Sequence, residues 1–144
     1  MNKYNLLFKV LIIYFAIQTN FAFSSMQNKI VANVGDEIIS SFELKNKIKS
    51  LLFLSNQSFN QENINKAKNK AVQLLIDKKL KNGELKKFEV KATTDGEVNE
   101  YLNNVSSKYN TNIQGLKKIF KNNNIDFELY EEEIRIEFMW QKFI

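Results

Sequence analysis

The stretch Lys29-Ile-Val-Ala-Asn-Val-Gly-Asp-Glu-Ile-Ile-Ser-Ser-Phe-Glu-Leu44 decides how the fold begins. Its apolar, β-branched segment from Ile30 to Val34 predicts a strand, and Gly35-Asp36 is typical of a two-residue hairpin turn with glycine first. Ser40, with Glu43 three residues later, has the spacing of a capping box that starts a helix. The stretch therefore predicts a β-hairpin that leads directly into a helix.

Downstream of this stretch, apolar residues recur at the 3.6-residue spacing of amphipathic helices. A long helix is expected from about Gln61 to Asn82, with Gly83 as its C-terminal stop. Thr94 to Glu97 has the pattern of a second capping box, Ile113 lies near the start of a short helix, and Asp126 is suited to cap the last one. The predicted fold class is mainly α: a small helical domain of about five helices with a short N-terminal β-hairpin.

The first 24 residues have the three parts of a secretory signal peptide. A polar start with one lysine precedes an unbroken apolar core from Val10 to Ile17, and Ala22-Phe-Ser24 supplies the small-x-small cleavage pattern. Cleavage between Ser24 and Ser25 is therefore expected, which leaves residues 25–144 as one exported domain. The alternative is an uncleaved anchor, but polar residues, Lys9 among them, interrupt the apolar run. We expect no stable membrane insertion after cleavage.

The composition argues against most catalytic chemistry. The chain has no cysteine and no histidine, which excludes thiol catalysis, histidine acid–base catalysis and most zinc sites. Its four glycines are isolated, so no phosphate-binding loop is expected. The densest acidic run, Glu131 to Glu133, is interpreted as a solvated helix flank because adjacent helical residues point in different directions. We predict no catalytic residue, no metal site and no cofactor.

The net charge does not indicate a nucleic-acid partner. The formal charge is +5, which becomes about +3 once Lys3 and Lys9 are removed with the signal. Residues 66–91 are basic and residues 126–137 are acidic, but the lysines alternate around a helix instead of concentrating on one face. A solvated surface is the expected meaning of this pattern.

The last predicted helix has two apolar faces where a surface helix normally needs one. One face is assigned to the core of the domain, and its members are Phe127, Tyr130, Ile134 and Phe138. The other face is the candidate polypeptide-binding site, and its members are Leu129, Ile136, Met139, Trp140 and Phe143. Three alternatives remain open for the second face: ordinary core contacts with other helices, a missing C-terminal segment, or a second copy of the chain.

Four segments in succession resemble one known family. The opening stretch resembles the strand, acidic turn, strand and capped helix that begin the N-terminal domain of SurA-type periplasmic chaperones. Ala71 to Leu80 is similar to the long central helix of that domain, and Val90 to Glu97 to the entry of its third helix. Tyr130-Glu-Glu-Glu-Ile-Arg-Ile-Glu137 resembles the Tyr-x-x-x-Ile-Arg-x-Glu signature of its last helix. Together these segments span essentially the whole mature chain.

The resemblance implies an ATP-independent chaperone, or holdase, that binds unfolded outer-membrane proteins in the periplasm. Such clients alternate apolar and polar residues and cannot bury the apolar side before membrane insertion. The parvulin-type isomerase domain and the C-terminal segment of longer members would follow residue 144, so prolyl isomerisation is not assigned to this chain. Two alternatives stay open: the N-terminal part of a peptidyl-prolyl isomerase, or a stand-alone assembly or dimerisation module.

Overall fold

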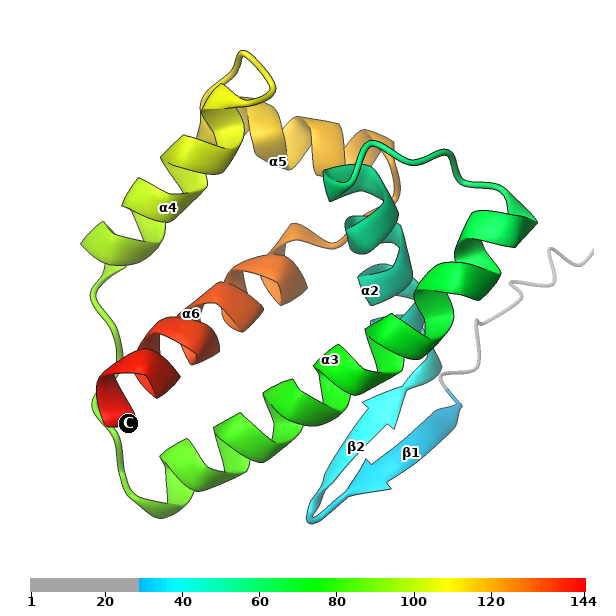
Figure 1. Cartoon of the computed structure of the whole chain (residues 1–144). Helices are drawn as coiled ribbons and strands as arrows, with labels where there is room; N and C mark the ends of the chain where they lie inside the picture. The colour runs from blue at the N-terminus through cyan, green and yellow to red at the C-terminus, as the bar shows by residue number, and fades with distance from the viewer. Residues whose placement is uncertain (1–28) are drawn as a thin grey trace, which may run out of the picture.

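The computed structural model describes residues 29–144 and confirms the predicted fold class, with five helices and a two-stranded hairpin among these residues (Figure 1). The proposed signal peptide and the Ser24–Ser25 cleavage site lie outside the described residues. In chain order the elements are β1 (Ile30–Val34), β2 (Glu37–Ser40), α2 (Ser41–Leu54), α3 (Gln61–Lys87), α4 (Asp95–Ser107), α5 (Ile113–Asn122) and α6 (Phe127–Phe143).

The hairpin and its junction with α2 follow the local sequence signals. β1 and β2 pair antiparallel, and Gly35 takes the left-handed backbone conformation at a φ of 57° that a turn with glycine first requires. The Glu43 backbone N–H donates to the Ser40 hydroxyl at 3.1 Å, and the Ser40 N–H donates to the Glu43 carboxylate at 2.9 Å. The predicted capping box is thereby confirmed, and it fixes the angle at which the chain leaves the sheet.

The expected end of the long helix at Gly83 is wrong, because α3 continues for one more turn to Lys87. A glycine in a helix interior costs about 1 kcal/mol relative to alanine, and burial of the Leu85 side chain offsets that cost. The helix ends instead where Glu89 turns left-handed at a φ of 50° and the Val90 N–H donates to the Leu85 carbonyl at 3.0 Å. Phe88 therefore belongs to this helix end.

Asparagine performs the same task at the ends of α2, α4 and α5. Asn56, Asn110 and Asn124 have φ values of 53°, 51° and 53°, and in each case the next residue donates its N–H to a carbonyl five residues earlier. Asparagine tolerates the left-handed region better than most residues, because its short amide bonds locally to the backbone. Part of the high asparagine content thus serves helix termination in a chain that has few glycines.

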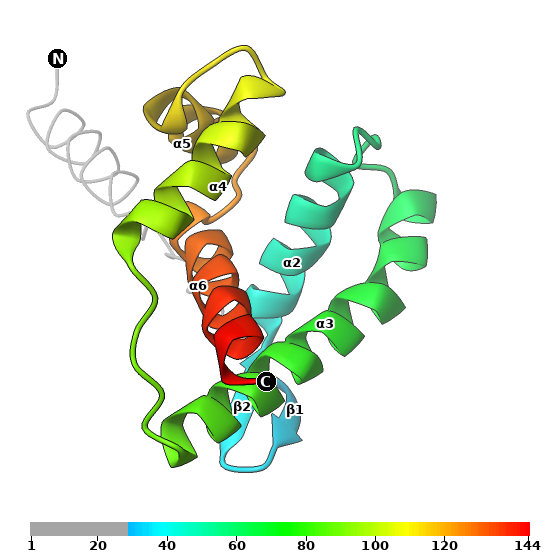
Figure 2. The ribbon, with the colours of Figure 1, turned by 60° about the vertical axis from the view of Figure 1, so that its left-hand side comes forward.

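The described residues form two lobes with separate cores, and α6 is the helix of the second lobe that faces the first (Figure 2). The hairpin lobe comprises β1, β2, α2 and α3, and the helical lobe comprises α4, α5 and α6. The buried core of the hairpin lobe is aliphatic and consists of Ile39, Leu44, Ile48, Leu52, Ala71 and Leu75. The buried core of the helical lobe consists of Val98, Leu102, Val105, Leu116, Phe120, Ile125, Phe127, Tyr130 and Ile134.

Aromatic rings organise the helical lobe around Phe120. The Phe120 ring contacts those of Phe127 and Tyr130, with centroids 5.3 and 5.1 Å away. Phe53 reaches across from α2, where its ring lies 5.3 Å from Phe120 and stacks on Tyr109 at 5.0 Å. The two cores are therefore joined by one aromatic side chain of α2 as well as by the contacts of α6.

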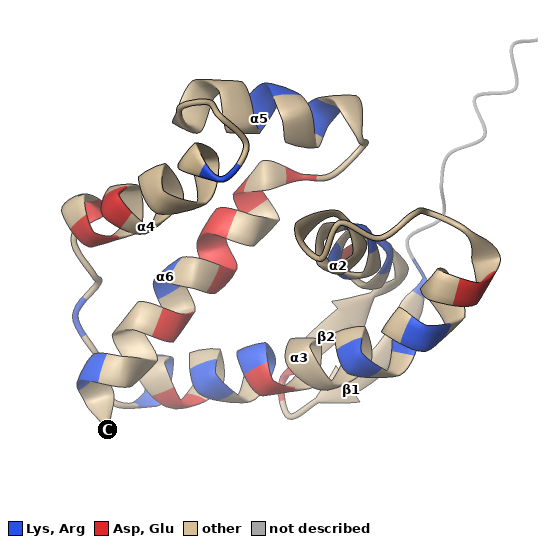
Figure 3. Cartoon of the chain, turned by 45° about the horizontal axis from the view of Figure 1, so that its top comes forward, with Lys and Arg blue, Asp and Glu red and all other residues tan. Residues whose placement is uncertain are grey.

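Ion pairs, which we call the ionic seam, connect α6 to the hairpin lobe. Its three pairs are Lys47–Glu133, Lys78–Glu132 and Lys81–Glu137. Lys78 is only 7% exposed, and its ammonium lies 2.5 Å from the Glu132 carboxylate. Figure 3 shows acidic residues along α6 and basic residues along α3. The expectation that Glu131 to Glu133 is only a solvated flank is thus wrong for Glu132 and Glu133, because the seam engages both.

Candidate binding surface

The inner face of α6 lies where the sequence placed it. Phe127, Tyr130 and Ile134 are buried in the core of the helical lobe, and Phe138 is partly buried against it. The Phe138 ring also meets the Tyr101 ring edge-on, with centroids 5.9 Å apart. Burial raises the pKa of the Tyr130 phenol far above its ordinary value, so this hydroxyl stays neutral. The assignment of these four residues to the core is confirmed.

The second face of α6 divides into a covered half and an open half. Ile136 is only 6% exposed, which contradicts its placement on an open face. Leu129 is partly buried and lines a cavity of about 10 Å³ together with Ser50 of α2 and Leu75 of α3. Leu129 is therefore covered by the hairpin lobe, and Ile136 is buried within the domain, as the alternative of ordinary core contacts expects.

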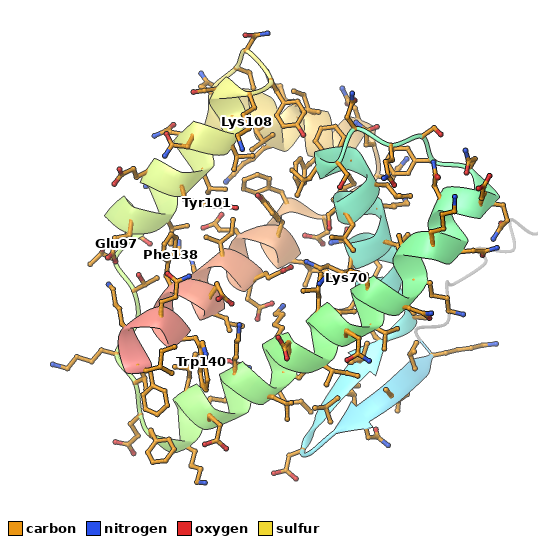
Figure 4. The ribbon with its side chains drawn as sticks, viewed as in Figure 1. Lys70, Glu97, Tyr101, Lys108, Phe138 and Trp140 are labelled. Atoms are coloured by element: carbon orange, nitrogen blue, oxygen red, sulfur yellow. The ribbon has the colours of Figure 1, made fainter. Side chains whose placement is uncertain are left out.

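The open half lies at the C-terminal end of the helix, where Met139 and Trp140 are partly buried and Phe143 is 37% exposed. The Phe143 ring lies 5.6 Å from Trp140 and 5.3 Å from Phe88, centroid to centroid. We call these three residues, Phe88, Trp140 and Phe143, the aromatic corner. Figure 4 shows Trp140 at the last turn of α6, near the far end of α3. The corner is an exposed apolar surface that two helix ends build together.

Phe88 is the member of this corner that the sequence did not reveal. It is 55% exposed, and the Lys87 ammonium lies 5.3 Å from the centre of its ring. Its position depends on the extra turn of α3 beyond Gly83, which carries the ring toward the end of α6. The local pattern Phe-x-Val is typical of a short strand and gave no sign of this helix end.

Ion pairs with α4 hold the corner in place. The Lys142 ammonium donates to the Glu97 carboxylate at 2.5 Å, and Arg135 contacts Asp95 at 2.8 Å. The bond from Lys142, with further bonds from the hydroxyls of Thr93 and Thr94, lowers the pKa of Glu97 to about 2. The end of α6 is thus tied to the start of α4 at neutral pH.

The described residues were also searched for a metal site and for a helix that could span a membrane. Within residues 29–144, no group of three or more carboxylate side chains is placed to hold a metal ion. Among the same residues, no helix combines the length and the hydropathy that crossing a bilayer requires. The surface features of interest include the aromatic corner and a cleft near the other end of α6.

A comparison with protein families finds a match that extends over nearly the whole chain. The model of the family described as SurA-like N-terminal domain matches residues 2–144. The matched region begins inside the stretch interpreted as a signal peptide. Comparisons with curated proteins and with solved structures gave no match.

Proposed function

This chain belongs to the SurA-like N-terminal domain family, and we propose on that basis that it is a periplasmic, ATP-independent holdase for unfolded outer-membrane proteins. The family is periplasmic, and its N-terminal domain is a chaperone-type module and not a catalytic one. The finer parts of the proposal are the export signal in residues 1–24, the cleavage after Ser24, and the class of client. The observation that carries the proposal is the aromatic corner at the end of α6.

The aromatic corner suits an extended and variable client. Adjacent rings of Trp140, Phe143 and Phe88 present apolar area outside any enclosed pocket. Alternate side chains of an extended chain lie on one side at intervals of about 6.6 Å, roughly 1 Å more than the 5.3 and 5.6 Å between these ring centroids. Contacts of this kind need no particular client sequence, so they favour weak binding to many partners.

The test of this proposal is the aggregation of a urea-denatured outer-membrane β-barrel protein after dilution. The purified chain at several-fold excess is expected to reduce light scattering without ATP. The double variant Trp140→Ala/Phe143→Ser removes most of the aromatic corner and is expected to lose at least half of that effect. Leu54→Ser is the matched control, because Leu54 on α2 is also 37% exposed but lies outside the corner. No reduction in scattering by the unmodified chain would refute the proposal.

An assembly module is the second candidate, because the corner and the 85% exposed Ile144 would also suit a permanent contact between copies. Analytical ultracentrifugation separates the two functions. A monomer mass from 1 to about 100 µM supports the holdase, since an obligate dimer interface this apolar would hold throughout that range. A dimer mass that persists on dilution and is lost in Trp140→Ala/Phe143→Ser would favour the assembly module.

A further inference from the structure

A second surface lies at the opposite end of α6 from the aromatic corner. A cleft of about 820 Å³ opens between α2, α5 and the first residues of α6. We call it the lysine cleft, after Lys45 and Lys49 on α2 and Lys117 and Lys121 on α5. Figure 3 shows basic residues on both of these helices. Lysines thus line two opposing walls of one concavity.

The charge of this cleft is largely uncompensated. In the part of the chain that the structure describes, none of the four ammonium groups pairs with a carboxylate. The Lys49 ammonium donates to the Asn124 carbonyl at 2.9 Å, and its partial burial, together with the charge of Lys45, lowers its pKa. An anionic ligand would relieve this repulsion.

Two carboxylates also lie at the cleft, and they do not neutralise it. Asp126 accepts the backbone N–H groups of Glu128 and Leu129 at 2.9 and 3.2 Å, so its charge is used to cap α6. Glu128 is exposed on the first turn of α6, where it faces the same helix end. Four lysines against these two groups leave the cleft positive.

Apolar side chains form part of the cleft as well. Phe42 is 40% exposed at its edge, and the buried residues Ile125 and Phe127 also line it. The Lys117 ammonium lies 5.1 Å from the centre of the Phe127 ring, which keeps this cation above an aromatic face. A ligand that fits must therefore combine negative charge with apolar groups.

We propose that the lysine cleft binds an extended polypeptide segment in which acidic side chains alternate with apolar ones. On each wall the two lysines are four residues apart, which on a helix is about 6 Å along the axis. Acidic residues two apart in an extended chain are about 6.6 Å apart on one side. The two repeats match closely, and the intervening apolar side chains contact Phe42 and its neighbours.

This inference rests on the proposed function, because it takes the ligand to be a client polypeptide. It adds a second contact at a distance from the aromatic corner, since the 17 residues of α6 span about 25 Å. An extended chain covers that length with roughly eight residues. A client that reaches both surfaces would gain avidity from two weak contacts without any further one.

The shape of the site favours a polypeptide over an anionic bilayer. A membrane surface is broad, so it is met best by lysines on a convex or flat face. Here the lysines come from two helices that line one concavity of about 820 Å³. Binding to anionic vesicles is accordingly an outcome that would count against the proposal.

The experiment measures fluorescence anisotropy of a labelled 12-residue peptide that alternates Glu and Leu, with a Gln and Leu peptide beside it. The full chain is expected to bind the Glu peptide more tightly, and added salt to weaken that binding. Lys45→Gln/Lys121→Gln is expected to weaken it by roughly five-fold, as for two exposed ion pairs. Lys118→Gln on α5 is the matched control, because Lys118 is exposed but does not line the cleft.

Equal binding of the two peptides, or unchanged binding by the double lysine variant, would overturn the proposal. So would sedimentation of the chain with phosphatidylglycerol vesicles when neither peptide binds. Thermal unfolding of each variant shows whether it is folded. If aggregation is suppressed but the Glu peptide does not bind, the cleft inference fails and the holdase stands. If the peptide binds but aggregation continues, the holdase fails.

Discussion

The two lobes stabilise their cores in different ways. The hairpin lobe spreads its burial over aliphatic side chains from three elements, whereas the helical lobe gathers aromatic rings around Phe120. Aliphatic contacts are non-directional, so the loss of one is shared by its neighbours. Ring contacts depend on orientation, and aromatic pairs add about 0.5–1.5 kcal/mol each beyond area burial. The helical lobe should therefore depend on one residue to a degree that the hairpin lobe does not.

The boundary between the lobes differs from both cores, because charged groups dominate it. Lys47 and Lys78 are buried there against glutamates of α6, where apolar side chains would have merged the two cores. Asn46 strengthens the same boundary, since its side-chain amide exchanges hydrogen bonds of 3.3 and 2.6 Å with the backbone of Asp126. Buried charge of this kind specifies how α6 sits but adds little net stability.

The largest expected effect is a loss of stability on truncating one core residue, and it should differ between the two lobes. Phe120→Ala removes a fully buried ring with three aromatic neighbours, and it should lower the free energy of unfolding by about 4 kcal/mol. Leu75→Ala in the hairpin lobe should cost about 3 kcal/mol. Urea unfolding followed by circular dichroism measures both. Phe120→Leu is the control, and a cost near that of Phe120→Ala would show that ring contacts, more than cavity volume, hold the lobe.

If Leu75→Ala lowers the free energy of unfolding more than Phe120→Ala does, the helical lobe does not depend on Phe120 in the way proposed here.

A smaller effect is expected at the ionic seam. Glu132→Gln leaves the buried Lys78 ammonium without its partner, and we expect a loss of about 1–2 kcal/mol because the Glu132 side chain is half exposed and screened. Lys78→Met in the same background should recover most of that loss, since an apolar side chain of similar length needs no partner. Equilibrium unfolding in urea provides the measurement. An unaffected Glu132→Gln protein would mean that the seam does not join the lobes.

The smallest effect is expected where α6 is tied to α4 at the surface of the helical lobe. Glu97 has a pKa of about 2 in the folded chain against an ordinary value of 4.5, so the unfolded chain binds its proton first as the pH falls. The stabilisation from Glu97 is therefore complete above about pH 4.5 and is lost progressively towards pH 2. Urea midpoints at pH 6 and pH 3 measure this loss.

Glu97→Gln should reduce the midpoint at pH 6 and have less effect at pH 3. The exposed Glu100→Gln on the same helix is the control. If Glu97→Gln lowers the urea midpoint equally at the two pH values, the Lys142–Glu97 ion pair is not a source of the loss of stability at low pH.

Local signals in the sequence were sufficient for most of the fold. The capping residues Ser40, Asn112 and Asp126 start their helices because each needs only neighbours within three positions. The end of α3 was misjudged because burial of Leu85, a tertiary effect, overrides the tendency of Gly83 to stop a helix. Sequence patterns describe propensities well and packing against distant elements poorly.

The candidate sites show the same division. Two apolar faces on α6 predict that two surfaces pack against this helix, but the pattern does not say whether each surface belongs to the same chain or to a partner. Ile136 proved to be buried within the domain. The lysine cleft gave no local signal, since its two walls lie more than 60 residues apart in sequence. Phe88 joined the aromatic corner only through the length of α3. Each of these features depends on how elements meet in space.

The division into lobes also has a kinetic consequence. Apart from Phe53, each core with the side chains packed against it comes from one contiguous part of the chain, residues 32–76 for one lobe and residues 98–138 for the other. Contacts that are close in sequence form fast, because little loop-closure entropy opposes them. The pairing of α6 with α2 and α3 has the longest sequence separation, so the ionic seam should close last. Refolding should therefore pass through a species in which each lobe has formed its own core while the lysines and glutamates of the ionic seam are still solvated.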